Sequence, residues 1–233
     1  MRSKTRVALG RGAEAEADAL EYCAARPDDA DGWLALGDAR LAMGPPKAGA
    51  QARAAFAKAA AILGPGDPRP SLGEGWSFLV LRKPREALAA LTAAAEDPKK
   101  HRAEILATRS RAHSSLGDWA AASDDLGRAI PDLERRLEDR RRIGAAKAGV
   151  DAARLTLADA YWRRGLAGEA LDRKAEALLD HKQACGLGLP AACARVASLE
   201  KPQPKPKPAP KAPPKPKRKK NPKGDSGERI YAN

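Results

Sequence analysis

Residues 33–63 read WLALGDARLAMGPPKAGAQARAAFAKAAAIL, and this stretch carries the clearest folding signal in the chain. Apolar residues around Trp33 lead to Gly37, and a turn rich in glycine and proline follows at 44–49. A second apolar stretch then places Phe56 one helical turn from alanines on either side. Small residues let two helices approach closely, while larger residues fill the space to their neighbours. The pattern predicts two antiparallel helices joined by a turn.

The same pattern recurs three times further along the chain. Each unit has a small residue, a turn about seven positions later, and an alanine of the second helix twelve positions later: Gly75 and Ala87, Ser110 and Ala122, and Ala158 and Ala170. The turn of the last unit is placed at Gly165. The alanines Ala52, Ala87 and Ala122 are evenly spaced, but the step from Ala122 to Ala170 is longer. We therefore expect an inserted helical extension of about 14 residues over 131–144. Its mixed charges favour a salt-bridged, exposed helix over a nucleic-acid site.

The spacing of these units and their residues resemble the tetratricopeptide repeat, a helix-turn-helix unit of about 34 residues. Trp33-Leu34-Ala35-Leu36-Gly37 matches the Trp-x-x-Leu-Gly start of that repeat. Such units stack, because none can bury its apolar face alone. The resemblance implies an all-α protein, a right-handed α-solenoid of tandem helix-turn-helix repeats over residues 13–199. An incomplete leading unit over 12–27 and a flexible segment over 1–12 are expected before it.

In this family the first helix of each repeat lines a concave groove, which holds a peptide or a helix of another protein. Carrying the lining positions over to this chain gives Leu34, Asp38, Leu41, Leu72, Trp76, Leu79, Arg111, Ser114, Leu155, Asp159, Trp162 and Arg163. Trp and Arg are frequent interface anchors. The candidate groove residues are therefore Asp38, Trp76, Arg111, Asp159, Trp162 and Arg163. For Trp76 and Trp162, a purely structural role between helices is equally open.

Residues 184–196 (ACGLGLPAACARV) resemble the turn of a SEL-like repeat, a relative with a longer turn. Some members of that group carry cysteines near both helix ends and oxidise them across the hairpin. The placement of Cys185 and Cys193 fits that arrangement. A reducing cytoplasm would keep both residues as thiols, and two small buried residues at a helix crossing are the favoured interpretation. The disulfide is the alternative.

The positive charge of the chain is concentrated behind residue 200. The net charge is +13, and residues 201–233 hold 11 Lys or Arg against two acidic residues. Alternating Lys and Pro can form neither a helix nor a core, so we expect residues 200–233 to be a disordered, extended tail. Through residues 201–220 this tail is an alternative binding element for a polyanion, such as nucleic acid, an anionic membrane or a cell-wall polymer.

The sequence gives no support for catalysis. His101, His113 and His181 are widely separated and lack metal-ligand spacing, and neither a phosphate loop nor a nucleophile elbow is present. No apolar run approaches the length of a membrane span, which is roughly 18 residues or more. We predict a scaffold that is not an enzyme, with no cofactor and no transmembrane segment, whose partner is another protein. Because no signal peptide follows Met1, we expect it in the cytoplasm; the periplasm or envelope is the alternative if an export signal lies upstream.

Overall fold

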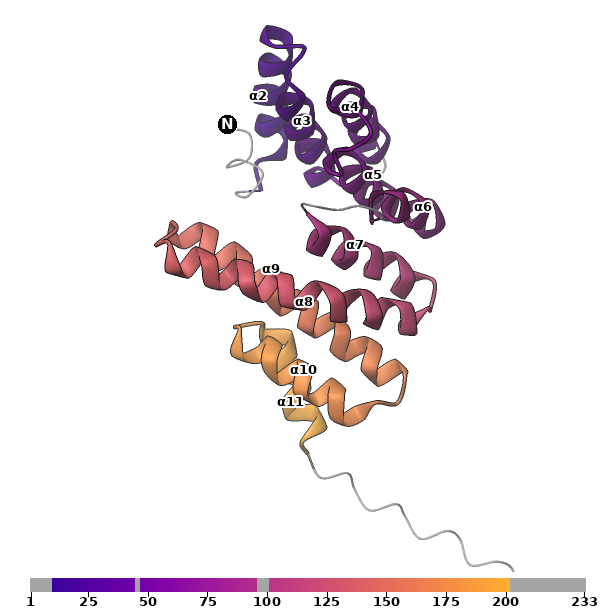
Figure 1. Cartoon of the computed structure of the whole chain (residues 1–233), viewed down its shortest axis with the longest axis vertical. Coiled ribbons are helices and arrows are strands. Elements are labelled where there is room, and N and C mark those ends of the chain that lie inside the picture. Colours follow the sequence, from indigo (N-terminus) through magenta and orange to yellow (C-terminus); the bar gives the residue numbers. More distant parts are fainter. Residues whose placement is uncertain (1–9, 45–46, 96–100, 202–233) are drawn as a thin grey trace, which may run out of the picture. The chain divides into compact units, whose positions relative to one another are not determined.

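The computed structural model describes residues 10–44, 47–95 and 101–201, and within these ranges it contains helices and turns but no strand. The helices in chain order are α2 (Gly12–Ala25), α3 (Ala30–Ala42), α4 (Lys47–Leu63), α5 (Arg69–Val80), α6 (Pro84–Ala95), α7 (Arg102–Ser115), α8 (Trp119–Arg142), α9 (Lys147–Ala170), α10 (Lys174–Gly186) and α11 (Pro190–Leu199) (Figure 1). The flexible start predicted over 1–12 and the disordered tail predicted over 200–233 lie almost wholly outside the described residues.

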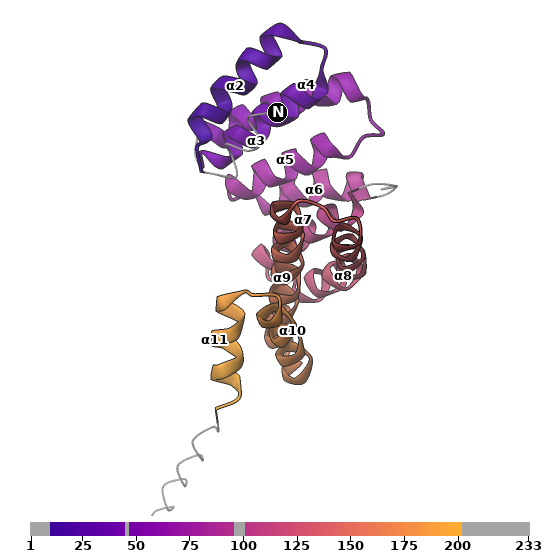
Figure 2. The ribbon, with the colours of Figure 1, turned by 90° about the vertical axis from the view of Figure 1, so that its left-hand side faces the viewer.

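Helices that are consecutive in the chain pack side by side (Figures 1 and 2). They form four helical hairpins, α3–α4, α5–α6, α7–α8 and α9–α10, with α2 before the first and α11 after the last. The first helices also contact one another, α3 against α5 and α5 against α7. Stacked repeats pack in this way, because each hairpin buries its apolar face on the next one. The predicted all-α solenoid is confirmed.

Phe56 of α4 shows why glycine recurs in the first helices. Its ring is 2% exposed and lies between Gly37 of α3 and Gly73 of α5. A Cβ atom on Gly37 would lie 2.5 Å from the ring, and one on Gly73 would lie closer still. Both distances are shorter than carbon atoms tolerate, so the two glycines leave the space that the ring fills. One aromatic side chain thereby joins two consecutive repeats.

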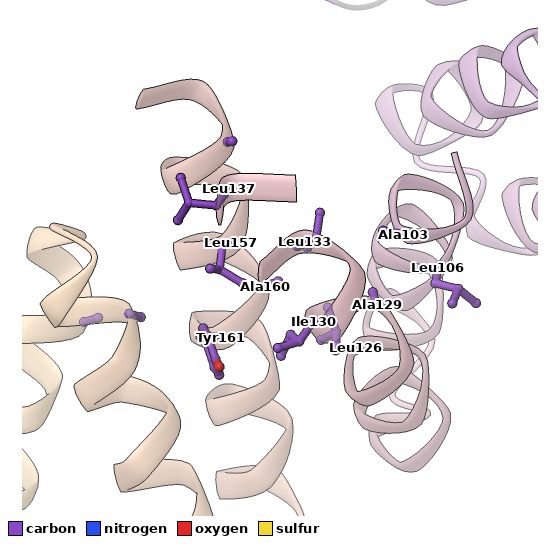
Figure 3. Close-up of a cluster of buried hydrophobic side chains, with 13 residues drawn as sticks. Ala103, Leu106, Leu126, Ala129, Ile130, Leu133, Leu137, Leu157, Ala160 and Tyr161 are labelled. Carbon is purple, nitrogen blue, oxygen red and sulfur yellow. The ribbon is translucent and has the colours of Figure 1, made fainter. Parts of the chain in front are cut away.

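An extensive apolar cluster joins α7, α8 and α9 (Figure 3). Leu106 of α7, Leu126 of α8 and Leu157 of α9 are at most 4% exposed. Helix α8 continues without a break to Arg142, and its second half adds Leu133 and Leu137 to the same cluster. The extension predicted over 131–144 is therefore helical up to Arg142. The expectation that it is an exposed helix was wrong in part, because its apolar face is buried.

The last repeat differs from the sequence prediction in its register. The sequence places a turn at Gly165 and the second-helix anchor at Ala170, but α9 runs through both residues and the turn covers 171–173. Gly165 instead leaves space for the ring of His181 in α10, which would lie 2.5 Å from a Cβ atom at that position. The second-helix anchor is Ala177, seven residues later than predicted and fully buried. Because seven residues are nearly two helical turns, both registers present the same helix face.

The turn between α9 and α10, like the turn between α5 and α6 with its left-handed Arg82, lacks the glycine that marks some other turns in this chain. Gly44, Gly117 and Gly188 follow helices with positive φ angles, the conformation that glycine adopts without strain. After α9 the left-handed residue is Asp172, with a φ of 58°. Aspartate is one of the few other residues that enter this region readily. The sequence prediction therefore took Gly165, seven residues upstream, as the turn.

Candidate functional site

Three predicted groove residues occupy the same position in consecutive first helices. Asp38, Trp76 and Arg111 directly follow the small residues Gly37, Gly75 and Ser110 of α3, α5 and α7. The guanidinium carbon of Arg111 lies 4.7 Å from the centroid of the Trp76 ring, which is a cation–π contact between neighbouring repeats. Asp38 is exposed on α3. The equivalence that the repeat predicts thus brings Trp76 and Arg111 together.

Asp159 of α9 extends this contact to a third first helix. Its Oδ2 atom accepts a hydrogen bond from Arg111 Nη2 at 2.6 Å and one from Arg163 Nε at 2.9 Å. The three side chains are 27–36% exposed, so solvent reaches all of them. Trp76, Arg111, Asp159 and Arg163 therefore form one cluster across three repeats, which we call the Arg111 site.

The Arg111 site is electrostatically unbalanced. Two guanidinium groups share one carboxylate, which leaves a formal charge of one positive unit. Burial lowers the pKa of the Arg111 guanidinium below its usual value, and the charge of Arg163 lowers that pKa further; Asp159 offsets only part of the effect. The site therefore holds more positive charge than its own carboxylate neutralises.

Trp162 of α9 packs toward α10 and the buried core. Its ring centroid lies 4.8 Å from that of His181 in α10, and the indole packs against the α7–α8–α9 cluster. The sequence left two roles open for Trp162, a groove anchor or packing between helices. These contacts match packing between helices. Leu155, another predicted groove position, is 48% exposed and lies one helical turn before Asp159 on the same face of α9.

Two partly buried ion pairs were not predicted from the sequence. Arg109 and Asp125 join α7 to α8 through hydrogen bonds of 2.8 and 2.5 Å, and Arg164 and Asp180 join α9 to α10 through bonds of 2.8 and 2.6 Å. In both pairs Asp follows Arg at the same separation of 16 positions. Arg164 also follows Arg109 by as many residues as Ala177 follows Ala122. This recurrence could have revealed the true register of the last repeat.

Two adjoining cavities lie among α8, α9 and α10. Their volumes are about 540 and 370 Å³, and both are lined by Tyr161 and Gln183. The Tyr161 hydroxyl donates a hydrogen bond of 2.5 Å to Glu134, and burial together with this bond raises the pKa of Tyr161 to about 12. None of the predicted groove residues lines either cavity. The cavities are therefore separate from the Arg111 site.

The structure joins Cys185 and Cys193 as the disulfide that the sequence left as the alternative. The Cα atoms are 4.7 Å apart, which lies within the range that a disulfide requires. The bond links the end of α10 to α11, and α11 also places Arg195 on Glu169 of α9. The hydrogen bond from Arg195 and a second one with the buried His181 lower the pKa of Glu169. The last helix is thus linked to α10 by the disulfide and to α9 by an ion pair.

The described residues, 10–44, 47–95 and 101–201, carry neither a metal-binding cluster nor a membrane-spanning helix. This part of the chain contains no group of three or more His, Cys, Asp or Glu residues arranged to hold a metal ion. Of the helices described there, none combines the length and the apolar character that crossing a bilayer requires.

Comparisons with known proteins connect the fold to the tetratricopeptide repeat. Neither the known family models nor the curated proteins give a match to this chain. Among solved structures, TTC0263, described as a thermophilic TPR protein in Thermus thermophilus, is similar with a TM-score of 0.60 and 20% identity over 84% of this chain and 94% of its own. MamA is similar with a TM-score of 0.54 and 16% identity over 83% of this chain and 96% of its own. At these identities the likeness establishes a TPR-like fold.

Proposed function

We propose that this protein is a non-catalytic scaffold, which binds a peptide or a helix of another protein on the surface formed by its first helices. One observation carries the proposal. Side chains from α5, α7 and α9 form the Arg111 site on that surface, and they include an aromatic ring and two guanidinium groups. Trp and Arg contribute disproportionately to binding energy at protein interfaces. The TPR-like fold supports the same assignment, because the first helices line the binding groove in that family.

Site-specific photo-crosslinking tests this proposal. A photoreactive amino acid replaces Leu155 on the first-helix surface, and a matched control replaces Leu179 of α10, which is 63% exposed. Both variants are irradiated in native lysate at high salt, where charge contacts of the basic tail are screened. We expect a discrete crosslinked protein from position 155 that position 179 does not give.

A second arm asks whether the crosslink depends on the Arg111 site. Combining the probe at position 155 with Trp76→Ala should strongly reduce the yield of that crosslinked protein. Equal crosslinking from both probe positions, or a crosslinking yield that Trp76→Ala leaves unchanged, would refute the proposal.

A further inference from the structure

The charge of the Arg111 site indicates what kind of partner it fits. Arg111 and Arg163 donate to the same oxygen of Asp159, and within the described residues neither guanidinium has a second carboxylate partner. A guanidinium group has five N–H donors, so each arginine retains donors that Asp159 does not use. An added carboxylate would neutralise the excess charge and accept these hydrogen bonds.

The positive charge is local, which distinguishes this surface from a nucleic-acid site. Residues 7–200 hold 29 Lys or Arg and 28 Asp or Glu, so the repeat region is almost neutral. A groove that follows a phosphate backbone needs a run of cations along its length. Here Asp38 occupies the position of α3 that corresponds to Trp76 and Arg111 in the next two repeats. One or two carboxylates match the site better than a chain of phosphates does.

Trp76 adds an apolar element to this charge. Its ring is half-buried and lies under the Arg111 guanidinium, so the stacked pair combines a flat apolar surface with a cation. Stacking on an aromatic ring leaves the edge donors of a guanidinium available for a carboxylate. A peptide with an acidic residue beside an apolar one therefore meets both features at once.

We propose that the Arg111 site binds an acidic segment of a partner protein, with a partner carboxylate placed between Arg111 and Arg163. This inference rests on the proposed scaffold function. In this arrangement the Asp159 carboxylate supplies, from within the protein, part of the negative charge that the partner would bring. Its removal should strengthen the binding of an acidic segment, whereas removal of either arginine should weaken it.

The experiment uses the full-length chain and peptides selected on it. A phage-displayed library of short random peptides is selected on the wild-type protein, and the best clone is synthesised with a fluorescent label. Fluorescence anisotropy then measures its affinity for wild type, Arg111→Gln, Arg163→Gln and Asp159→Asn. Arg128→Gln is the matched control, because Arg128 lies on the second helix α8 and is 49% exposed. An excess of free peptide 201–220 is present during selection and titration, so acidic clones that bind the basic tail are competed away.

We expect the selected peptides to be enriched in Asp and Glu. Affinity should fall about tenfold or more in Arg111→Gln and Arg163→Gln, rise in Asp159→Asn, and stay unchanged in Arg128→Gln. Thermal melting of each variant shows whether it is folded, and Arg111→Lys, which keeps the charge, should bind better than Arg111→Gln.

Several outcomes would overturn the inference. Selected peptides that are neutral or basic, no peptide that depends on the two arginines, or weaker binding by Asp159→Asn would each do so. A dT20 oligonucleotide whose binding falls with Arg111→Gln as much as that of the peptide would assign the site to nucleic acid. If position 155 still crosslinks a partner while these charge variants have no effect, the scaffold function stands and only its charge preference fails.

Discussion

Gly37 and Gly127 both lie inside helices, but their surroundings differ. A Cβ atom on Gly37 would meet the Phe56 ring at 2.5 Å, whereas one on Gly127 would meet nothing within 4 Å. We predict that Gly37→Ala lowers the free energy of unfolding by about 1–2 kcal/mol through overpacking. Gly127→Ala should raise it by about 1 kcal/mol, because alanine favours the helix. Urea denaturation compares the two variants, and a Gly37→Ala protein as stable as wild type would contradict the packing described here.

Tyr161 makes the stability of the protein sensitive to alkaline pH. Its pKa is raised to about 12 by burial and by the bond to Glu134, while an unfolded tyrosine titrates near pH 10. The group therefore contributes stability that is complete below about pH 10 and is lost as pH rises from about 10 through 12. Tyr161→Phe should remove this alkaline loss, as measured by urea unfolding between about pH 8 and 12. An unchanged pH dependence in Tyr161→Phe would refute the assignment.

At the scale of helices, a buried ion pair between Arg109 and Asp125 holds α7 and α8 together. The neighbouring residue Asp124 offers a control. Asp125 is 3% exposed and pairs with Arg109, whereas Asp124 is 72% exposed and lies 3.9 Å from Arg128. Asp125→Ala should cost about 3 kcal/mol, because it leaves a largely buried guanidinium without its partner. Asp124→Ala should cost less than about 0.5 kcal/mol. Similar losses from both variants in thermal melting would show that the Arg109–Asp125 pair contributes little.

Helix α11 depends on the link between Cys185 and Cys193, since Ala192 is its only buried residue among those described. Protein purified and denatured without reductant should show one free thiol, that of Cys23. The double variant Cys185→Ser and Cys193→Ser should lose about 2 kcal/mol of protection against hydrogen exchange in residues 190–199, because the short loop is no longer closed. Reductant should have the same effect on wild type and none on the double variant. A count of three thiols would contradict the disulfide.

The helical elements were predictable from sequence wherever the repeat units are evenly spaced. The hairpins of Phe56, Leu91 and Leu126 follow the even spacing of Ala52, Ala87 and Ala122, and their register is as predicted. The last hairpin was not predictable in this way, because the insertion breaks the even spacing. In addition, Gly165 suggests a turn but lies inside α9, nearly two helical turns before the true turn at Asp172. The Trp76–Arg111 contact follows from equivalent repeat positions. The Arg111–Asp159 bond does not, because it crosses the insertion and depends on the length of α8 and α9.

At the scale of the whole molecule, the stacked hairpins turn three distant segments into one surface. Trp76, Arg111 and Asp159 belong to three different hairpins of the sequence, yet they form a continuous set of contacts. Each repeat contributes only one or two side chains, so no single hairpin carries the site. In a solenoid such a surface is set by the interfaces between neighbouring repeats. We infer that the first-helix surface, and not any individual repeat, is the functional unit.

The most direct test of this claim is the affinity of the partner recovered by the probe at position 155, measured by isothermal titration at high salt. Wild type is compared with Trp76→Ala and with Leu179→Ala on α10. We predict that Trp76→Ala weakens binding at least about tenfold without a matching loss of thermal stability, and that Leu179→Ala binds as wild type does. Wild-type affinity in Trp76→Ala, or a loss confined to Leu179→Ala, would contradict the claim that the first-helix surface binds the partner.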